Sequence, residues 1–225
     1  MTDTELATAA PDRAGSRRPI PDIVQDAADT HIRALQSGYL RDHPDAVASL
    51  ARIRRGVGKP VHAVPDLWGL TGTELLYSEI DERRRPEDFL RAENAVHIAV
   101  TLWALHQQSR RDVPMHVTRG PHLGRAVRDL MPQEQFDEPI RRRFVRVGTA
   151  SSLDVLTQRL RDIVLLLRQE ARPMDYGVLA TQLYRWQQPG GRGAVHREWG
   201  RNFHARAQPG PVAAPTSTSD KKEAS

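Results

Sequence analysis

The hydrophobic positions of this chain follow the spacing of α-helices through almost all of its central part. Apolar side chains recur three and four positions apart, as the buried face of a helix requires. The segment "LDVLTQRLRDIVLLLRQE" is typical, with one stripe formed by Leu153, Leu156, Leu160, Ile163 and Leu167. No stretch alternates apolar and polar positions with the β-branched enrichment of a strand. The pattern predicts an all-α protein of about eight or nine helices.

One segment differs from the amphipathic helices around it. In "RPEDFLRAENAVHIAVTLWALHQQSRR", the residues from Ala95 to Leu105 are apolar on nearly every side of the predicted helix. A helix of this kind is buried all round, so we expect it at the centre of the fold. His97 and His106 lie on opposite faces of this helix, and we interpret them as histidines of the core or its edge.

The chain divides by composition into five segments. Residues 1–20 are rich in Ala, Thr, Pro and charge, and residues 206–225 form a Pro/Ala/Ser/Thr tail. Both segments have too few apolar residues to bury, so we expect them to be disordered. Between them the pattern predicts a two-part protein, with an N-terminal helical part over 21–120 and a C-terminal helical bundle over 139–205. Residues 121–138 are the predicted connecting region.

The chain is basic, and its basic residues are mostly arginines. It carries 33 Lys and Arg against 28 Asp and Glu, for a net charge of +5. The lysines are Lys59, Lys221 and Lys222. Arginine suits planar, bidentate contacts with phosphate or carboxylate, although codon usage in a high-GC genome explains the composition equally well. Cysteine is absent, which excludes disulfides and thiolate chemistry. No apolar run reaches the length of about 20 residues that spans a bilayer, so we expect a soluble, cytoplasmic protein.

The positive charge is concentrated toward the C-terminal end of the folded part. Residues 139–206 contain 13 arginines and five acids, which gives 13 − 5 = +8. Within "PIRRRFVRVG" the arginines flank an apolar stripe of Ile140, Phe144 and Val147. Arg197 and Arg201 are four positions apart and lie opposite the Val195, Trp199 and Phe203 stripe, while Arg52, Arg55 and Lys59 are spaced at i, i+3 and i+7. Such faces are typical of contact with a phosphate backbone, and the alternative is solvated arginines paired with nearby acids.

Catalytic chemistry finds little support in the sequence. The nine histidines form no HExxH pair and no spacing typical of a metal site. The "GVGKP" segment at 56–60 lacks the spacing of a phosphate-binding loop, so we interpret its glycines as a turn. We interpret Trp68 as a loop anchor, with stacking on a nucleic-acid base as the alternative. We therefore expect no enzymatic activity, no cofactor and no bound metal.

Several blocks of the sequence resemble a known family in order and spacing. They are "LARIRRGVGKP" (50–60), "AENAVHIAVTLWALHQQS" (92–109), "GRAVRDL" (124–130), "RRRFVRVGTASSLDVLTQRLRDIVLLLRQE" (141–170), "DYGVLATQLYRWQQP" (175–189) and "HREWGRNF" (196–203). Together they resemble the CasB family, the small subunit of the type I-E CRISPR surveillance complex Cascade. The resemblance covers most of residues 25–204.

The resemblance implies a non-catalytic, all-helical subunit that is present in two copies packed end to end, alongside the other Cascade subunits. It implies contacts with the guide RNA, the target DNA and the displaced single-stranded DNA, through which the R-loop is stabilised. The arginine-rich blocks give the candidate nucleic-acid-binding residues: Arg52, Arg54, Arg55, Lys59, Arg125, Arg128, Arg141, Arg142, Arg143, Arg146, Arg197 and Arg201. Two alternatives remain: a purely structural assembly subunit whose arginine faces contact neighbouring proteins and, less favoured, a metal-dependent nuclease.

Overall fold

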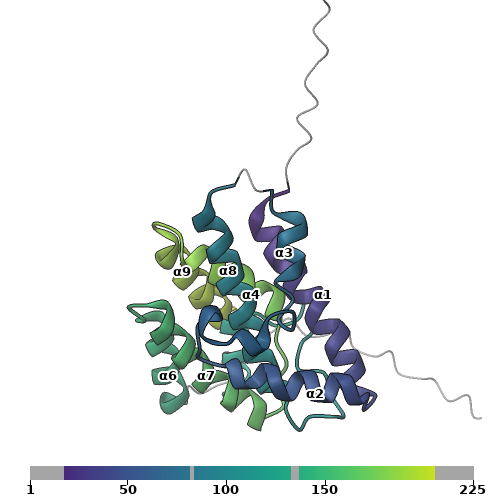
Figure 1. Ribbon diagram of the computed structural model, residues 1–225. Helices are drawn as coiled ribbons and strands as arrows, with labels where there is room; N and C mark the ends of the chain where they lie inside the picture. The colour runs from purple at the N-terminus through teal and green to yellow at the C-terminus, as the bar shows by residue number, and fades with distance from the viewer. Residues whose placement is uncertain (1–17, 82–83, 133–136, 206–225) are drawn as a thin grey trace, which may run out of the picture.

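The computed structural model describes residues 18–81, 84–132 and 137–205, and over these residues the protein is helical (Figure 1). Nine α-helices and three short 3-10 turns (η1–η3) account for its regular structure, with no β-strand among the described residues. The all-α prediction is confirmed. The helices are α1 (Ile20–Leu40), α2 (Pro44–Ile53), α3 (Glu74–Glu79), α4 (Pro86–Gln107), α5 (Leu123–Arg128), α6 (Glu138–Gly148), α7 (Leu153–Gln169), α8 (Tyr176–Trp186) and α9 (Gly191–His204).

Two predicted segments fall largely outside the described residues. The disordered N-terminal segment was expected over 1–20, but the structure describes only its last three residues, and α1 already begins at Ile20. The predicted tail over 206–225 lies outside the described residues entirely. Among the described residues, none of the helices combines the length and the hydrophobicity of a membrane span.

Helix α4 forms the centre of the hydrophobic core, as its apolar pattern predicts. Val96, Val100 and Trp103 are completely buried, and α1, α7 and α8 all pack against this helix. Figure 1 shows α4 near the middle of the molecule, between α1 and the C-terminal helices. A helix surrounded in this way buries every face, which explains why apolar residues occupy nearly every position from Ala95 to Leu105.

The first helix packs along a helix from the C-terminal end of the chain. The Thr181 hydroxyl of α8 donates to the Pro21 carbonyl of α1 at 3.1 Å, and Gly177 allows α8 to approach the backbone of α1 at Gln25. The buried apolar residues of both predicted parts form a single cluster. The two parts predicted along the sequence therefore share one core, and the division at 121–138 stays a prediction.

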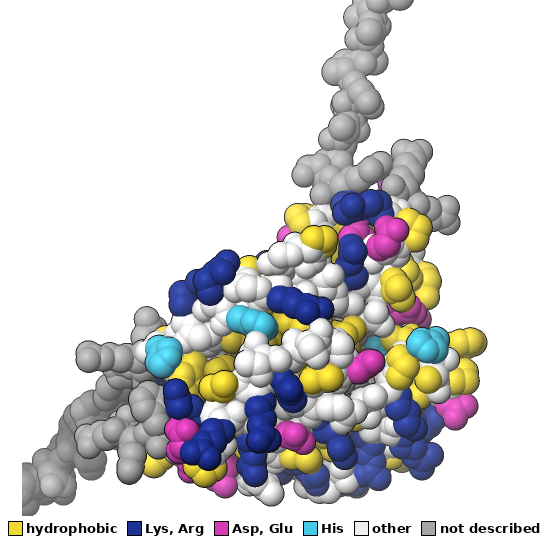
Figure 2. Space-filling model, turned by 90° about the vertical axis from the view of Figure 1, so that its left-hand side faces the viewer, with side chains coloured by type: hydrophobic (Ala, Val, Ile, Leu, Met, Phe, Trp, Pro, Cys, Tyr) yellow, Lys and Arg dark blue, Asp and Glu magenta, His cyan; other side chains and the backbone are white. Residues whose placement is uncertain are grey.

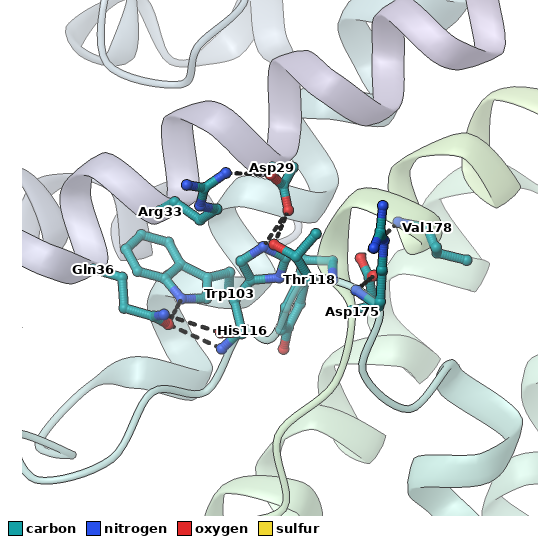
Figure 3. A network of polar contacts seen from close by, with 10 residues as sticks. Asp29, Arg33, Gln36, Trp103, His116, Thr118, Asp175 and Val178 are labelled. Carbon is teal, nitrogen blue, oxygen red and sulfur yellow. Dashed lines mark hydrogen bonds and ion pairs between the residues drawn. The ribbon is translucent and has the colours of Figure 1, made fainter.

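A buried polar network ties the segment around His116 to three helices (Figure 3). The ring of His116 contacts Asp29 of α1 through Nε2 at 2.9 Å, and its Nδ1 accepts from the Tyr176 amide of α8 at 3.1 Å. The side chain of Gln36 bonds both backbone groups of His116 at 2.9 Å and accepts from the Trp103 indole of α4 at 3.2 Å. These contacts satisfy the polar groups that burial removes from water.

Two carboxylates complete this network. Burial raises the pKa of Asp29, but hydrogen bonds from Thr118 and His116 outweigh it and hold the pKa below its usual range. The carboxylate of Asp175 caps α8 by accepting from the Val178 amide at 3.0 Å, and it also accepts from the Arg119 amide at 2.8 Å. The network thus fixes the 115–119 segment between the first helix and the C-terminal helices.

Candidate nucleic-acid interface

Helix α6 carries the densest group of arginines and is anchored by its opposite face. The Asp137 side chain caps the helix by accepting from the Ile140 amide at 3.0 Å. Val147 is completely buried, and the ring of Phe144 stacks on Phe203 of α9 with centroids 5.1 Å apart. The apolar stripe predicted for this helix therefore meets the stripe predicted for α9, and the arginines are left on the outside.

All four arginines of α6 (Arg141, Arg142, Arg143 and Arg146) are exposed. Arg141 and Arg142 share one acid, Glu138, at 3.2 and 3.0 Å, and hydrogen bonding from Arg142 and then from Arg141 lowers the pKa of this exposed carboxyl. Within the described residues, Arg143 and Arg146 have no acidic partner. Exposed ion pairs of this kind stabilise little. Helix α6 contains four arginines and one acid, so its net charge is 4 − 1 = +3.

Helix α9 repeats this arrangement on a neighbouring surface. Val195, Trp199 and Phe203 are buried, and the Trp199 indole donates to the Gln182 side chain of α8 at 2.7 Å. Arg197 and Arg201 lie on the exposed face and pair with no acid among the residues that the structure describes. The predicted opposition of an apolar stripe and an arginine face is therefore present in both α6 and α9.

The two arginines of α5 have a different environment. Arg125 is half-buried, pairs with Asp129 at 2.8 Å and donates to the Ala205 carbonyl at 3.2 Å. Arg128 is also half-buried and donates to the Pro132 carbonyl at 2.9 Å. Both guanidinium groups thus contact their own protein, and they are the least available of the predicted residues for a phosphate.

The N-terminal basic cluster lies at the end of α2 and in the turn after it. Arg52, Arg55 and Lys59 line one cavity of about 340 Å³, and Arg52 donates to the Asp66 carbonyl at 3.0 Å. Helix α2 ends at Ile53, so the turn after it, and not helical spacing, brings Lys59 to the two arginines. Arg54 is half-buried.

Helix α7 lies between this turn and α6. The turn contacts α7 at Gly58, which lies against the side chain of Gln158, and Arg159 donates to the Arg146 carbonyl and to the Thr149 hydroxyl at the end of α6. Figure 2, which faces the side of the molecule where α6 lies, shows Lys and Arg side chains gathered along its lower part. The exposed Arg161 of α7 was not among the predicted residues, although it lies on the polar side of the leucine stripe.

The described residues form no metal site. No group of three or more His, Asp or Glu side chains lies close enough to hold a metal ion. His97 and His106 are buried in the core, as predicted from their positions. Trp68 is 70 % exposed, so its interpretation as a loop anchor is wrong.

The fold and the surface together define an all-helical protein with arginines on exposed helix faces, and comparison with known proteins gives its family. The family model described as CRISPR-associated protein Cse2 matches residues 49–204. The chain therefore belongs to the CRISPR-associated Cse2 family, also called CasB, and the resemblance seen in the sequence is confirmed. Members of this family are the non-catalytic small subunit of type I-E Cascade.

Two solved structures share the fold. The crystal structure of CasB from Thermobifida fusca is 50 % identical, with a TM-score of 0.74, and the match covers 81 % of this chain and 98 % of that one. A chain from a structure described as a CRISPR RNA-guided surveillance complex is 23 % identical, with a TM-score of 0.57 and coverage of 80 % and 93 %. The search of curated proteins by sequence found no match.

Proposed function

We propose that this chain stabilises the R-loop of type I-E Cascade by contacting phosphate backbones with its exposed arginines. The contacts would be made to the guide RNA–target DNA hybrid and to the displaced non-target strand. The observation that carries this proposal is the pair of arginine faces on α6 and α9, which are exposed and short of acidic partners among the described residues. The surveillance complex that contains a chain of the same fold is described as RNA-guided, which supports a nucleic-acid partner.

The physics of R-loop formation makes such contacts effective. Exchanging a DNA duplex for an RNA–DNA hybrid is nearly balanced in free energy, so protein contacts to the backbones decide whether the open state persists. These contacts need no base readout, because the guide supplies the sequence specificity. Arginines held on folded helices suit this task, and the Phe144–Phe203 stack brings α6 into contact with α9.

Charge reversal on these faces tests the proposal. We expect Arg197→Glu with Arg201→Glu, and separately Arg142→Glu with Arg143→Glu, to weaken R-loop formation by the reconstituted complex about tenfold or more, because each pair places repulsive charges beside phosphates. R-loop yield is measured against complex concentration by gel shift, and circular dichroism confirms that each variant is folded.

A matched control keeps the change in net charge constant. Arg41→Glu with Arg172→Glu also reverses two exposed arginines, but outside the four predicted clusters, and we expect R-loop yield close to that of the parent. Equal yields for all three double variants would show that the arginines of α6 and α9 do not act on the nucleic acid. The cytoplasmic location and the second copy within the complex stay predictions.

A further inference from the structure

A group of exposed apolar side chains gathers at one place on the N-terminal part of the protein. Trp68, Tyr77 and Leu90 are 70, 62 and 56 % exposed, and all three line one cavity of about 400 Å³. We name this cavity the aromatic groove; His62, Glu74, Glu93 and Asn94 also line it. Scattered exposed apolar residues are ordinary, but large ones that converge on a concave surface mark an interaction site.

The charge of the aromatic groove is opposite to that of the arginine faces. Glu74 and Glu93 line it, and no Arg or Lys does. The Tyr77 hydroxyl donates to the Glu93 carboxylate at 3.2 Å, which holds that carboxylate at the rim beside the ring. Carboxylates repel phosphates, so the groove does not suit a nucleic acid, and base stacking on Trp68 is disfavoured. It suits a cation next to an apolar group.

The groove is formed before any partner binds. The turn that carries Trp68 is held on α1, because the ring of His31 contacts the Leu70 carbonyl at 2.8 Å and Gly72, with φ of +74°, lies directly against that ring. On the other wall, the ring of Tyr77 packs on Phe89 with centroids 4.6 Å apart. A preformed aromatic surface binds a partner with a small entropic cost.

We infer that the aromatic groove docks a segment of another protein subunit of the surveillance complex. That segment carries an aliphatic or aromatic side chain, which is placed between Trp68, Tyr77 and Leu90, and an adjacent Arg or Lys, which pairs with Glu74 and Glu93. A guanidinium can also lie over the face of Trp68. The inference rests on membership of the family and not on the proposed phosphate contacts.

Two double variants test the two components of this surface. Trp68→Ser with Leu90→Ser removes the apolar contacts, and Glu74→Lys with Glu93→Lys reverses the charge. The probe is a complex assembled from the remaining Cascade subunits and guide RNA, into which each purified variant is titrated. We expect each double variant to bind it about tenfold or more weakly than the parent. Aromatic anchors carry much of the energy of such interfaces, and the introduced lysines repel the basic residue of the partner.

The control and the competing measurement separate this inference from the proposed function. Val117→Ser removes an apolar side chain that is 37 % exposed and lies outside the groove, and it should bind the complex like the parent. Binding of single-stranded DNA by the isolated groove variants should not weaken, because the groove is not a phosphate site. Unchanged incorporation of both double variants would overturn the inference.

A photocrosslink identifies the occupant. Leu90 is replaced by p-benzoylphenylalanine, the assembled complex is irradiated, and the crosslinked peptide is mapped by mass spectrometry. The expected product joins the groove to a different protein subunit at an apolar residue within a few positions of an Arg or Lys. Crosslinks to nucleic acid, to residues 1–17 of the same chain, or to a second copy would overturn it. If the crosslink joins the groove to a second copy, we expect it on α6, where Val145 is 50 % exposed among arginines.

Discussion

Single buried histidines show how polar side chains are held in this core. His97 contacts the Lys59 carbonyl through Nε2 at 3.1 Å, and His106 contacts the Tyr176 hydroxyl through Nδ1 at 2.9 Å. Burial lowers the pKa of both rings, for His106 from 6.5 to about 3. Both rings are therefore neutral at physiological pH, and they act in packing and hydrogen bonding.

The lowered pKa of His106 makes stability depend on pH. The unfolded chain binds the proton of His106 more readily than the folded one. The contribution of the neutral ring to the free energy of unfolding is therefore complete above about pH 6.5 and is lost as the pH is lowered toward 3. We expect His106→Leu to reduce the loss of unfolding free energy between pH 7 and pH 5 by about 1 to 2 kcal/mol. Urea unfolding at the two pH values measures this difference.

The parent, measured at the same two pH values, is the control. The loss of the Tyr176 hydrogen bond in His106→Leu lowers stability at both pH values, so the diagnostic quantity is the difference between them. An equal loss in parent and variant would contradict the assignment of this pH dependence to His106.

At the scale of elements, the close crossing of α5 and α9 depends on one glycine. A Cβ atom at Gly124 would be forced against the backbone carbonyl oxygen of Trp199 and would lie 2.9 Å from the Phe203 amide nitrogen. Since backbone atoms cannot move aside as a flexible side chain can, only glycine permits this approach. The short helix α5 is thereby held on α9, next to the exposed Arg197 and Arg201.

Two glycine substitutions should have opposite effects. Gly124→Ala forces α5 away from α9 and should lower the unfolding free energy by about 1 to 3 kcal/mol. Gly200→Ala, within α9, places its Cβ in open space and should raise the unfolding free energy by about 0.5 to 1 kcal/mol, because alanine favours the helix. Thermal unfolding followed by circular dichroism compares them. A Gly124→Ala protein as stable as the parent would show that the crossing can relax.

At the scale of the whole molecule, two kinds of surface occur on one chain. The arginine faces of α6 and α9 are basic, whereas the aromatic groove is apolar and lined by Glu74 and Glu93. The net charge of +5 sums over the whole chain, so it does not show that basic and acidic residues lie on different surfaces. The separation suits a subunit that contacts nucleic acid with one surface and proteins with another.

The salt dependence of binding distinguishes phosphate contact from purely structural assembly. We expect the isolated protein to bind single-stranded DNA with an affinity that falls steeply with salt, because each neutralised phosphate releases counterions. Replacing Arg197 and Arg201 by Gln should lower the slope of log affinity against log salt by about 1 to 2, as expected for two lost phosphate contacts.

The matched variant for this measurement is Arg41→Gln with Arg172→Gln, which removes the same charge elsewhere and should keep the slope of the parent. Fluorescence anisotropy of a labelled oligonucleotide between low and physiological salt provides the data. No measurable affinity at low salt would favour the structural assembly subunit over the nucleic-acid-binding one.

The amphipathic pattern by itself determined the helices and the outward faces of α6 and α9. Helical spacing is a local property, so a stripe such as Val195, Trp199 and Phe203 fixes the buried face and, with it, the exposed position of Arg197 and Arg201. The sequence also predicted the burial of α4, because a helix that is apolar on all sides is surrounded by other elements.

Tertiary structure decided what depends on residues far apart in the chain. It placed α1 against α8, joined Arg125 to the Ala205 carbonyl, and brought Lys59 beside Arg52 around one cavity. It also left Trp68 exposed beside Glu74, which no local pattern indicates. Each of these features is a contact between segments whose positions are set by the packing of the core as a whole, and periodicity along one helix carries no information about its neighbours.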